Sequence, residues 1–376
     1  MQHIVIVGNG IAGLTAADSL KEIGFTGKLT IVGDEMHRPY SRPALSKSAM
    51  HEEGAITAHI LPEPEHGATE LLGVKAIGLD IDKQEVQLSN GELLHYDGLV
   101  IATGIHPRKV REDLDLEFTF RTFEDAAWLR DHLKSKPKVV VIGAGVLGME
   151  LASTCNHFGC DVTVIPRRKP LLASLGDYLG NIFIAAAEAK GVKFVSFFAS
   201  DVSERNGKKY VTLADGSELE ADIVITAIGD SPNTAWLTNS GLLVDGELIV
   251  DSRGRVAPNI VAAGDVAAIP TLSGHQRIPL WTSAIEQAKV AARALSLGDN
   301  TPELDFQPYF WTEQFGFALK ACGNLPLNGS PDYIEGNPAR EPSLMRWSNP
   351  DGTGTAVSIN YRIPIPKLRA LSRQAP

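Results

Sequence analysis

The chain has 376 residues, of which 44% are hydrophobic and 21% are charged, and its formal net charge is −10 at pH 7. This length exceeds what a single hydrophobic core usually serves, so two or three domains are expected. The acidic balance argues against general binding to nucleic acid or to a membrane surface, and no apolar run reaches the roughly 18 residues that span a bilayer.

A dinucleotide-binding fingerprint of the form GxGxxG lies near the start of the chain, at Gly8–Gly13. It follows the apolar run His3–Val7, which predicts a strand, and it opens a helical pattern. In such a loop the first glycine forms a tight turn, the second lets the backbone approach a pyrophosphate, and the third lets helix pack on strand. The pyrophosphate binds the free N–H groups at the helix N-terminus. Because the strand begins beside Met1, no signal or transit peptide is predicted, and a cytoplasmic location is expected.

The next predicted strand, Leu29–Val32, is followed by two acidic residues. A fingerprint of this kind places an acid about 20 residues after its last glycine, where the carboxylate binds a ribose hydroxyl. Glu35 is the favoured candidate for this role, and its neighbour Asp34 is the competitor.

Short alternating segments follow and predict antiparallel strands, before a fully apolar segment that predicts a buried strand ending in glycine. The alternating segments are residues 74–77 and 85–88, with a turn at 89–91, and the buried strand is residues 98–104.

A second fingerprint, Gly143–Gly148, follows the apolar run Val139–Ile142, and the plan of the first half then repeats. The repeated segments are a strand at 162–165, a meander around 202 and 210–213, and a strand at 223–229. Two fingerprints predict two bound dinucleotides, and the usual reason to hold two is to pass electrons between them.

The last part of the chain predicts a strand at 259–266, a helix over 284–297 and, from residue 303, a small α+β domain. The three cysteines are Cys155, Cys160 and Cys322. The first two have the C-x4-C spacing that is also found in the redox-active pair of flavin disulfide reductases. In those enzymes the pair follows the first fingerprint, whereas here it follows the second. They are therefore expected to be buried structural thiols in a reducing compartment.

These features together resemble the FAD-dependent pyridine nucleotide-disulfide oxidoreductases, and specifically their ferredoxin-reductase branch. The most discriminating string is Arg38–Lys47, RPYSRPALSK, which is similar to the branch's PYxRPxLSK and contains no cysteine. Further matches are Ala102–Gly104, Ala263–Val266, Trp281 with Gln287, and Pro308–Gln314.

The resemblance implies an α/β fold with two Rossmann-like domains and a small α+β C-terminal domain. The expected FAD-binding domain is 1–107 with 231–302, the NAD(P)-binding domain is 108–230, and the interface domain is 303–376. The implied activity is transfer of electrons from NAD(P)H through FAD to a ferredoxin or another small iron–sulfur acceptor, in an oxygenase system. A monomer or homodimer without a metal site is expected.

The resemblance also assigns roles to side chains. Lys47 and Arg42 are expected near the flavin, where a cation stabilises the negative charge of its reduced form, and Pro43 is expected to stiffen the backbone beside it. Glu150 is expected near the nicotinamide. Together with Lys47 and Trp281, it forms the predicted catalytic set. The predicted cofactor contacts are Gly8, Gly10, Ile11, Ala12, Gly13, Glu35, Arg42, Pro43, Lys47, Ala102, Thr103, Gly104, Gly143, Gly145, Val146, Leu147, Gly148, Glu150, Arg167, Arg168, Gly229, Gly264, Asp265, Trp281 and Trp311.

Several of these assignments have structural alternatives. Lys47 and Arg42 are either flavin neighbours or part of a solvated basic loop. Asp265 is implied to bind the flavin's ribityl chain, and it is equally placed to cap an apolar helix beginning there. Trp281 and Trp311 are expected against the flavin and nicotinamide, or else in an interdomain core.

The chain departs from its relatives at several points. Pro166-Arg167-Arg168-Lys169 stands where NADH-preferring relatives carry an acid, which favours NADPH mildly, and Pro279 replaces a glutamate before Trp281. The tail is shorter than usual, and its last residues carry several cations and no acid. Two interpretations of this basic tail stay open: a docking face for an acidic ferredoxin, or a frayed terminus without a function. The cations concerned are Arg340, Arg346, Arg362, Lys367, Arg369 and Arg373.

Two other classes of function stay open. One is an NAD(P)H oxidase, or a reductase of rubredoxin or of a nitrite-reducing system, although the missing cysteine near residue 42 argues against the thiol-dependent versions. The other is a non-catalytic redox sensor that resembles apoptosis-inducing factor.

Overall fold

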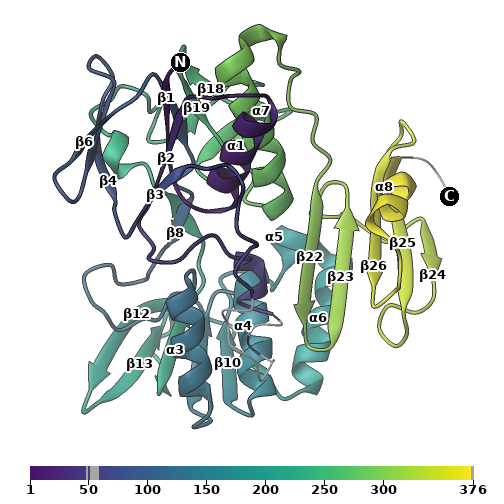
Figure 1. The fold of residues 1–376 in the computed structure, drawn as a ribbon. Helices are drawn as coiled ribbons and strands as arrows, with labels where there is room; N and C mark the ends of the chain where they lie inside the picture. Colours follow the sequence, from purple (N-terminus) through teal and green to yellow (C-terminus); the bar gives the residue numbers. More distant parts are fainter. Residues whose placement is uncertain (48–49, 51–58, 374–376) are drawn as a thin grey trace. The chain divides into compact units, whose positions relative to one another are not determined.

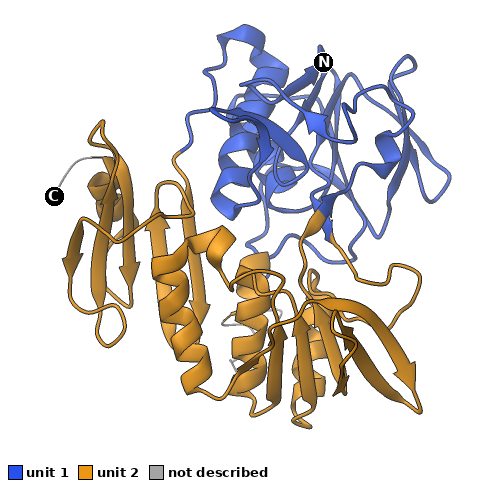
Figure 2. Ribbon diagram, turned by 180° about the vertical axis from the view of Figure 1, so that it is seen from behind, with its two compact units in different colours: residues 1–41, 59–106, 231–306 blue, residues 42–58, 107–230, 307–376 orange. Residues whose placement is uncertain are grey.

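The structure, a computed structural model, describes residues 1–47, 50 and 59–373 (Figure 1). The chain divides into two compact units, each assembled from three segments (Figure 2). Unit 1 comprises Met1–Ser41, His59–His106 and Ser231–Phe306, and unit 2 comprises Arg42–Ala58, Pro107–Asp230 and Gln307–Pro376. Strand β8 (Ile105–Pro107) leads out of unit 1, and β16 (Asp230–Pro232) leads back.

Unit 1 is built on a six-stranded sheet in the order β18-β19-β7-β1-β2-β3, parallel except that β18 runs antiparallel to β19. The strands are β1 (His3–Val7), β2 (Lys28–Gly33), β3 (Thr69–Leu72), β7 (Gly98–Ile101), β18 (Arg255–Ala257) and β19 (Ile260–Ala262). In β1, Ile4 and Ile6 belong to one hydrophobic cluster and Val5 and Val7 to another. The strand is thus buried on both faces, which explains its continuous apolar run.

Helices α1 (Ile11–Glu22) and α7 (Trp281–Leu297) lie side by side in unit 1 (Figure 1). The helix predicted over 284–297 is confirmed, but it begins earlier, at Trp281. Leu280, in an extended conformation with φ −115° and ψ 138°, is its N-cap. Short 3-10 helices follow residues 234 and 297, at η3 (Ala235–Leu237) and η4 (Gly298–Asn300).

The remaining strands of unit 1 form two three-stranded sheets. The antiparallel segment predicted at 85–88 is confirmed as β5 (Glu85–Leu88), whereas the one predicted at 74–77 lies two to three residues later, as β4 (Ala76–Asp80). A third strand, β6 (Leu93–His95), which the sequence analysis does not predict, completes this sheet. The other sheet contains β17 (Leu248–Ile249), β20 (Ala267–Thr271) and β21 (Gly274–Arg277). The helix considered as starting at Asp265 is wrong, because the residues after it pair with β17 and β21 as β20.

Unit 2 contains a four-stranded parallel sheet in the order β11-β10-β9-β15. Its strands are β9 (Lys138–Ile142), β10 (Asp161–Ile165), β11 (Lys193–Phe194) and β15 (Ile223–Thr226), and the predicted meander is β12 (Ala199–Arg205), β13 (Lys208–Leu213) and β14 (Glu218–Ala221). Its described helices include α3 (Phe123–Leu133), α4 (Val146–His157), α5 (Leu172–Leu175) and α6 (Asp177–Ala189), with the 3-10 helix η1 at Arg42–Ala44. Thr122 caps α3 in a reciprocal capping box with Asp125.

The tail of the chain is an α+β element inside unit 2, with an antiparallel sheet in the order β22-β23-β26-β25-β24. It consists of β22 (Tyr309–Gln314), β23 (Phe317–Cys322), β24 (Tyr333–Glu335), β25 (Ser343–Ser348), β26 (Gly354–Ile359) and α8 (Ile365–Arg373). Residues 365–373 are therefore helical rather than frayed. Within the described part of the chain, none of the helices is both long and apolar enough to cross a bilayer.

Candidate functional site

The first glycine-rich loop connects β1 to α1 with the geometry that a dinucleotide fingerprint requires. Gly8 has φ +120°, and a Cβ there would lie 2.1 Å from the carbonyl oxygen of Ala102. A Cβ at Gly13 would lie 1.9 Å from the carbonyl oxygen of Gly8. A Cβ at Gly10 would meet no described atom within 4 Å. The first and third glycines are thus required by packing, whereas the second borders open space that suits a pyrophosphate.

The surroundings of this loop carry unsatisfied and pre-positioned polar groups. Both polar atoms of the Asn9 side chain are buried and have no hydrogen-bond partner among the described residues. Because a buried amide without partners is costly, this arrangement suits a polar ligand beside Gly10. Glu35 is half-buried and accepts a hydrogen bond of 2.5 Å from Tyr40, whereas Asp34 is exposed. The geometry therefore favours Glu35 as the ordered carboxylate.

Other predicted contacts lie at the ends of β7 and β19 in unit 1. Thr103 and Asn233 are linked by two hydrogen bonds, of 2.9 and 2.8 Å. The backbone N–H of Gly264 donates to Gln287 Oε1 at 3.0 Å. Gln287, which the sequence analysis noted only as a match, thus holds the turn that carries Asp265.

The second glycine-rich loop, between β9 and α4, repeats the first in detail. Gly143 has φ +106°, and a Cβ there would lie 2.2 Å from the carbonyl oxygen of Ala227. A Cβ at Gly148 would lie 2.1 Å from Gly143 O, and one at Gly145 would meet nothing within 4 Å among the described atoms. Gly229, at the end of this region, has φ +109° and likewise borders open space.

The duplication extends to backbone hydrogen bonds. Gly8 N donates to Val32 O and Gly143 N to Ile165 O, each at the end of the neighbouring strand, at 2.7 and 2.9 Å. Together the two loops make two separate glycine-rich cradles, one in each unit, with the geometry of a dinucleotide fingerprint.

A buried polar network in unit 2 joins three residues to the carboxylate of Glu150 on α4. Lys47 Nζ lies 3.0 Å from Oε2 of Glu150, and their side chains are 8% and 2% exposed. Ser46 Oγ donates to the same oxygen at 2.6 Å, and Thr312 Oγ1 donates to Oε1 at 2.6 Å. Both oxygens of this buried carboxylate thus have partners, namely one cation and two hydroxyl donors.

Trp311 on β22 lies beside this network. The ammonium of Lys47 is 5.8 Å from the centroid of the Trp311 ring, and Tyr309 stacks on that ring at 5.7 Å. Lys47 Nζ also donates to the carbonyl oxygen of Pro43 at 3.1 Å, and Arg42 donates to the carbonyl oxygen of Arg121 at 2.7 Å. Lys47 is therefore not a solvated loop residue.

Sequence reasoning missed Ser46 and Thr312 as members of this network. Both lie inside strings that carried the resemblance, Arg38–Lys47 and Pro308–Gln314, but a hydroxyl residue has no signal of its own. Gln314, on the same face of β22, donates to Thr312 Oγ1 at 3.0 Å. Trp281, predicted with Lys47 and Glu150, is the first residue of α7 in unit 1.

The three cysteines are free and buried. Cys155 lies on α4 and Cys160 follows that helix. Burial raises the pKa of both thiols, which disfavours the reactive thiolate. This arrangement confirms the structural interpretation of the pair.

Comparison with known proteins agrees with this geometry. A family model described as pyridine nucleotide-disulphide oxidoreductase matches residues 2–288. The chain is 30% identical over 390 residues to the 3-phenylpropionate/cinnamic acid dioxygenase ferredoxin–NAD(+) reductase component of Photorhabdus laumondii subsp. laumondii, with 98% of this chain and 96% of that protein covered.

Two solved structures are similar over nearly the whole chain. The ferredoxin reductase for the CYP199A2 system from Rhodopseudomonas palustris has a TM-score of 0.86 and 25% identity, covering 96% of this chain and 92% of that one. Putidaredoxin reductase, in a covalent complex with putidaredoxin, has a TM-score of 0.86 and 27% identity, covering 99% and 93%.

Proposed function

Because the chain belongs to the pyridine nucleotide-disulphide oxidoreductase family, we propose that it is an FAD-containing, NAD(P)H-dependent ferredoxin reductase that serves an oxygenase. Members of this family are oxidoreductases that use FAD and NAD(P)H. The observation that carries the proposal is the pair of open cradles at Gly10 and Gly145, one for each dinucleotide. The relative from Photorhabdus and the solved structure from Rhodopseudomonas palustris, both named as ferredoxin reductases, support the acceptor, and putidaredoxin reductase in complex with putidaredoxin supports a protein acceptor.

The chain's own residues bind and orient the two dinucleotides and neutralise the charge that the flavin gains on reduction. When bound, FAD would supply the hydride-accepting and one-electron-donating chemistry that links NAD(P)H to an iron–sulfur protein. The Gly8 and Gly143 loops hold the pyrophosphates, and Glu35 binds the adenosine ribose of FAD. Lys47 supplies the cation that balances charge gained on reduction, and Glu150 holds its ammonium in place through a 3.0 Å ion pair.

The test is cytochrome c reduction with candidate ferredoxins present and absent, using NADH and NADPH in parallel. Turnover that requires both a nucleotide and a ferredoxin supports the proposal. Equal turnover without any ferredoxin, with oxygen consumed, identifies an oxidase instead. Anaerobic stopped-flow distinguishes an enzyme from a redox sensor. Fast reduction of the flavin by NAD(P)H indicates the enzyme, whereas slow reduction with a long-lived charge-transfer complex indicates the sensor.

FAD is expected to bind noncovalently. The described part of the flavin-contact string, Arg38–Lys47, contains no cysteine and no histidine to form a covalent link. Acid precipitation of the purified protein should therefore leave a yellow supernatant. Yellow colour that stays in the protein pellet would contradict this prediction.

We propose that the acceptor docks on the basic C-terminal element, with two corrections to the predicted face. Arg346 is 3% exposed and donates to the carbonyl oxygens of Leu371 and Gly352, at 2.8 and 2.6 Å, so it holds α8 and the loop after β25 rather than a partner. Arg369 is half-buried, and its Nε is buried without a hydrogen-bond acceptor among the described residues. The exposed cations are Arg340, Arg362, Lys367 and Arg373.

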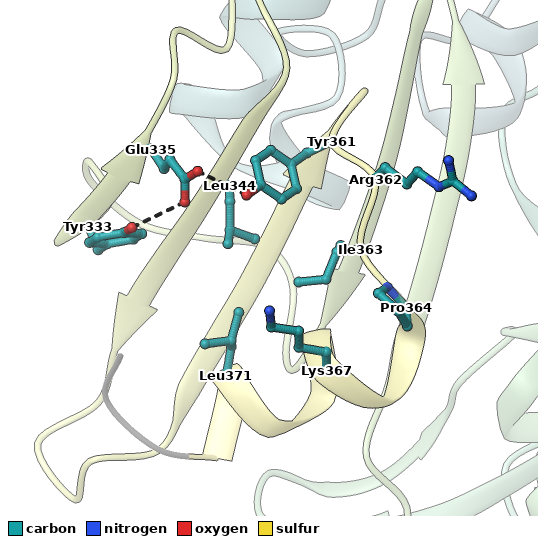
Figure 3. Close-up of a pocket in the computed structure, with 9 residues that line it drawn as sticks. All are labelled: Tyr333, Glu335, Leu344, Tyr361, Arg362, Ile363, Pro364, Lys367 and Leu371. Carbon is teal, nitrogen blue, oxygen red and sulfur yellow. Dashed lines mark hydrogen bonds between the residues drawn. The ribbon is translucent and has the colours of Figure 1, made fainter.

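Figure 3 shows a pocket of about 280 Å³ between α8 and the sheet, in which the ammonium of Lys367 borders the cavity. Glu335, the acid in its lining, accepts hydrogen bonds from Tyr361 and Tyr333 at 2.9 and 3.3 Å. No described carboxylate forms an ion pair with Lys367 or Arg362. Both cations are therefore available to an acidic ferredoxin.

Reversal of charge at these two positions, Arg362→Glu with Lys367→Glu, should lower the rate of ferredoxin reduction and leave ferricyanide reduction intact. The wild-type rate should also fall between low and physiological salt, because the screening length shortens to about 8 Å. Lys21→Glu with Lys75→Glu is the matched control, because these two exposed cations of unit 1 also form no ion pair with a described carboxylate. If the rate of ferredoxin reduction changes neither with salt nor in the charge-reversed variant, the ferredoxin docks on another surface of the protein.

The boundaries of the three domains, the monomer or homodimer and the cytoplasmic location stay predictions.

A further inference from the structure

The end of β10 is the place where a site of this kind reads the 2′ position of the adenosine ribose. An acid there binds a 2′-hydroxyl, whereas an arginine accommodates a 2′-phosphate. After Ile165 the chain continues Pro166-Arg167-Arg168-Lys169, and it contains no Asp or Glu before Asp177. The position therefore lacks the group that would favour NADH.

The loop that follows β10 is held against the second glycine-rich loop at two points. Gly143 N donates to Ile165 O at 2.9 Å, and Leu171 N donates to Ala144 O at 2.9 Å. Leu171 is 2% exposed and adopts φ +59°, so its side chain anchors the returning end of the loop. Residues 166–170 are thus fixed beside the cradle at Gly145.

The three cations of this loop differ in their partners. Lys169 is ion-paired with Asp177 in the first turn of α6, so its charge is already balanced. Arg167 and Arg168 are exposed, and no described carboxylate forms an ion pair with either. Two guanidinium groups beside a dinucleotide cradle are therefore left without a protein anion.

We propose that Arg167 and Arg168 bind the 2′-phosphate of NADPH and make this chain an NADPH-preferring enzyme. The proposal rests on the proposed function and adds the identity of its electron donor. A guanidinium presents a planar set of donors that matches phosphate oxygens bidentately, which an ammonium does not. Since the loop is anchored at both ends, little backbone order has to be gained when the phosphate binds.

The test measures binding separately from turnover. Isothermal titration of the FAD-loaded wild-type protein with 2′,5′-ADP and with 5′-AMP compares two probes that differ only in the 2′-phosphate. At least about a tenfold preference for 2′,5′-ADP is expected, since one hydrogen bond to a charged group is enough to produce a factor of that size. Arg167→Ala with Arg168→Ala should abolish the preference and leave the affinity for 5′-AMP unchanged.

Lys169→Ala is the matched control, because it removes a cation from the same loop that is already paired with Asp177. This variant should keep the preference for 2′,5′-ADP. Equal affinities for the two probes in the wild-type protein, or a preference that survives the double arginine variant, would overturn the proposal.

The outcome stays distinct from that of the proposed function. Arginine-dependent binding of 2′,5′-ADP without reduction of any ferredoxin would support the nucleotide assignment and reject the acceptor. Ferredoxin reduction with equal KM values for NADH and NADPH would support the acceptor and reject the nucleotide assignment.

Discussion

Lys47→Met is expected to slow reduction of the bound flavin by about 10- to 100-fold while FAD stays bound, a range typical of one lost electrostatic contact. Lys47 is 8% exposed and ion-paired with Glu150, so its charge lies in a site with little water to screen it. Removal of the ammonium leaves no other described cation bonded to that carboxylate. Anaerobic stopped-flow at saturating NAD(P)H measures the rate, and the visible spectrum measures the bound flavin.

The single variant also leaves Glu150 buried without its counter-ion, which by itself costs about 3–5 kcal/mol of stability. Lys47→Met with Glu150→Gln removes both charges and keeps an amide that Ser46 and Thr312 can still contact. If the double variant is as slow as the single one, the cation acts on the reaction. A double variant that recovers the wild-type rate would show that Lys47 only neutralises Glu150.

Leucine at Gly145 is expected to lower kcat/KM for NAD(P)H by about 100-fold or more and to leave FAD in place. Gly145 is the N-cap of α4 with φ −74° and ψ −174°, a conformation open to any residue, and a Cβ there meets no described atom within 4 Å. The fold should therefore accept the side chain, and only the pyrophosphate loses its place. Loss of two charge-assisted hydrogen bonds, at about 1.5 kcal/mol or more each, corresponds to that factor.

Gly10→Leu is the matched variant in unit 1, where Gly10 is the N-cap of α1 with φ −96° and ψ −168°. It is expected to yield a folded, colourless protein that has lost FAD. Circular dichroism checks the fold, flavin absorbance reports the first site, and nucleotide titration reports the second. Yellow Gly10→Leu protein, or unchanged NAD(P)H kinetics in Gly145→Leu, would contradict the assignment of the corresponding cradle.

Much of the fold follows from short-range patterns in the sequence. The fingerprints Gly8–Gly13 and Gly143–Gly148 lie at strand-to-helix turns as predicted, because their glycines are required by contacts that the turn itself creates. The apolar runs that precede them become strands buried on both faces. The sequence also shows that no acidic residue directly follows the strand that ends at Ile165, since this depends only on residue type and on distance from a strand end.

The sequence by itself thus determined the two glycine-rich strand-to-helix turns, the strand that leads into each and the residues at the carboxyl ends of those strands. All of these depend on neighbours within one β-α-β unit. Only the tertiary structure decided that Ser46, Lys47 and Thr312 meet at Glu150, from segments more than 100 residues away from it. It also decided that Asp265 leads into β20 rather than a helix, and that Arg346 is buried under α8. Tertiary packing decides which strands pair, which donors reach a buried carboxylate and whether an arginine is exposed. Local periodicity does not predict which distant segments of the chain pack together.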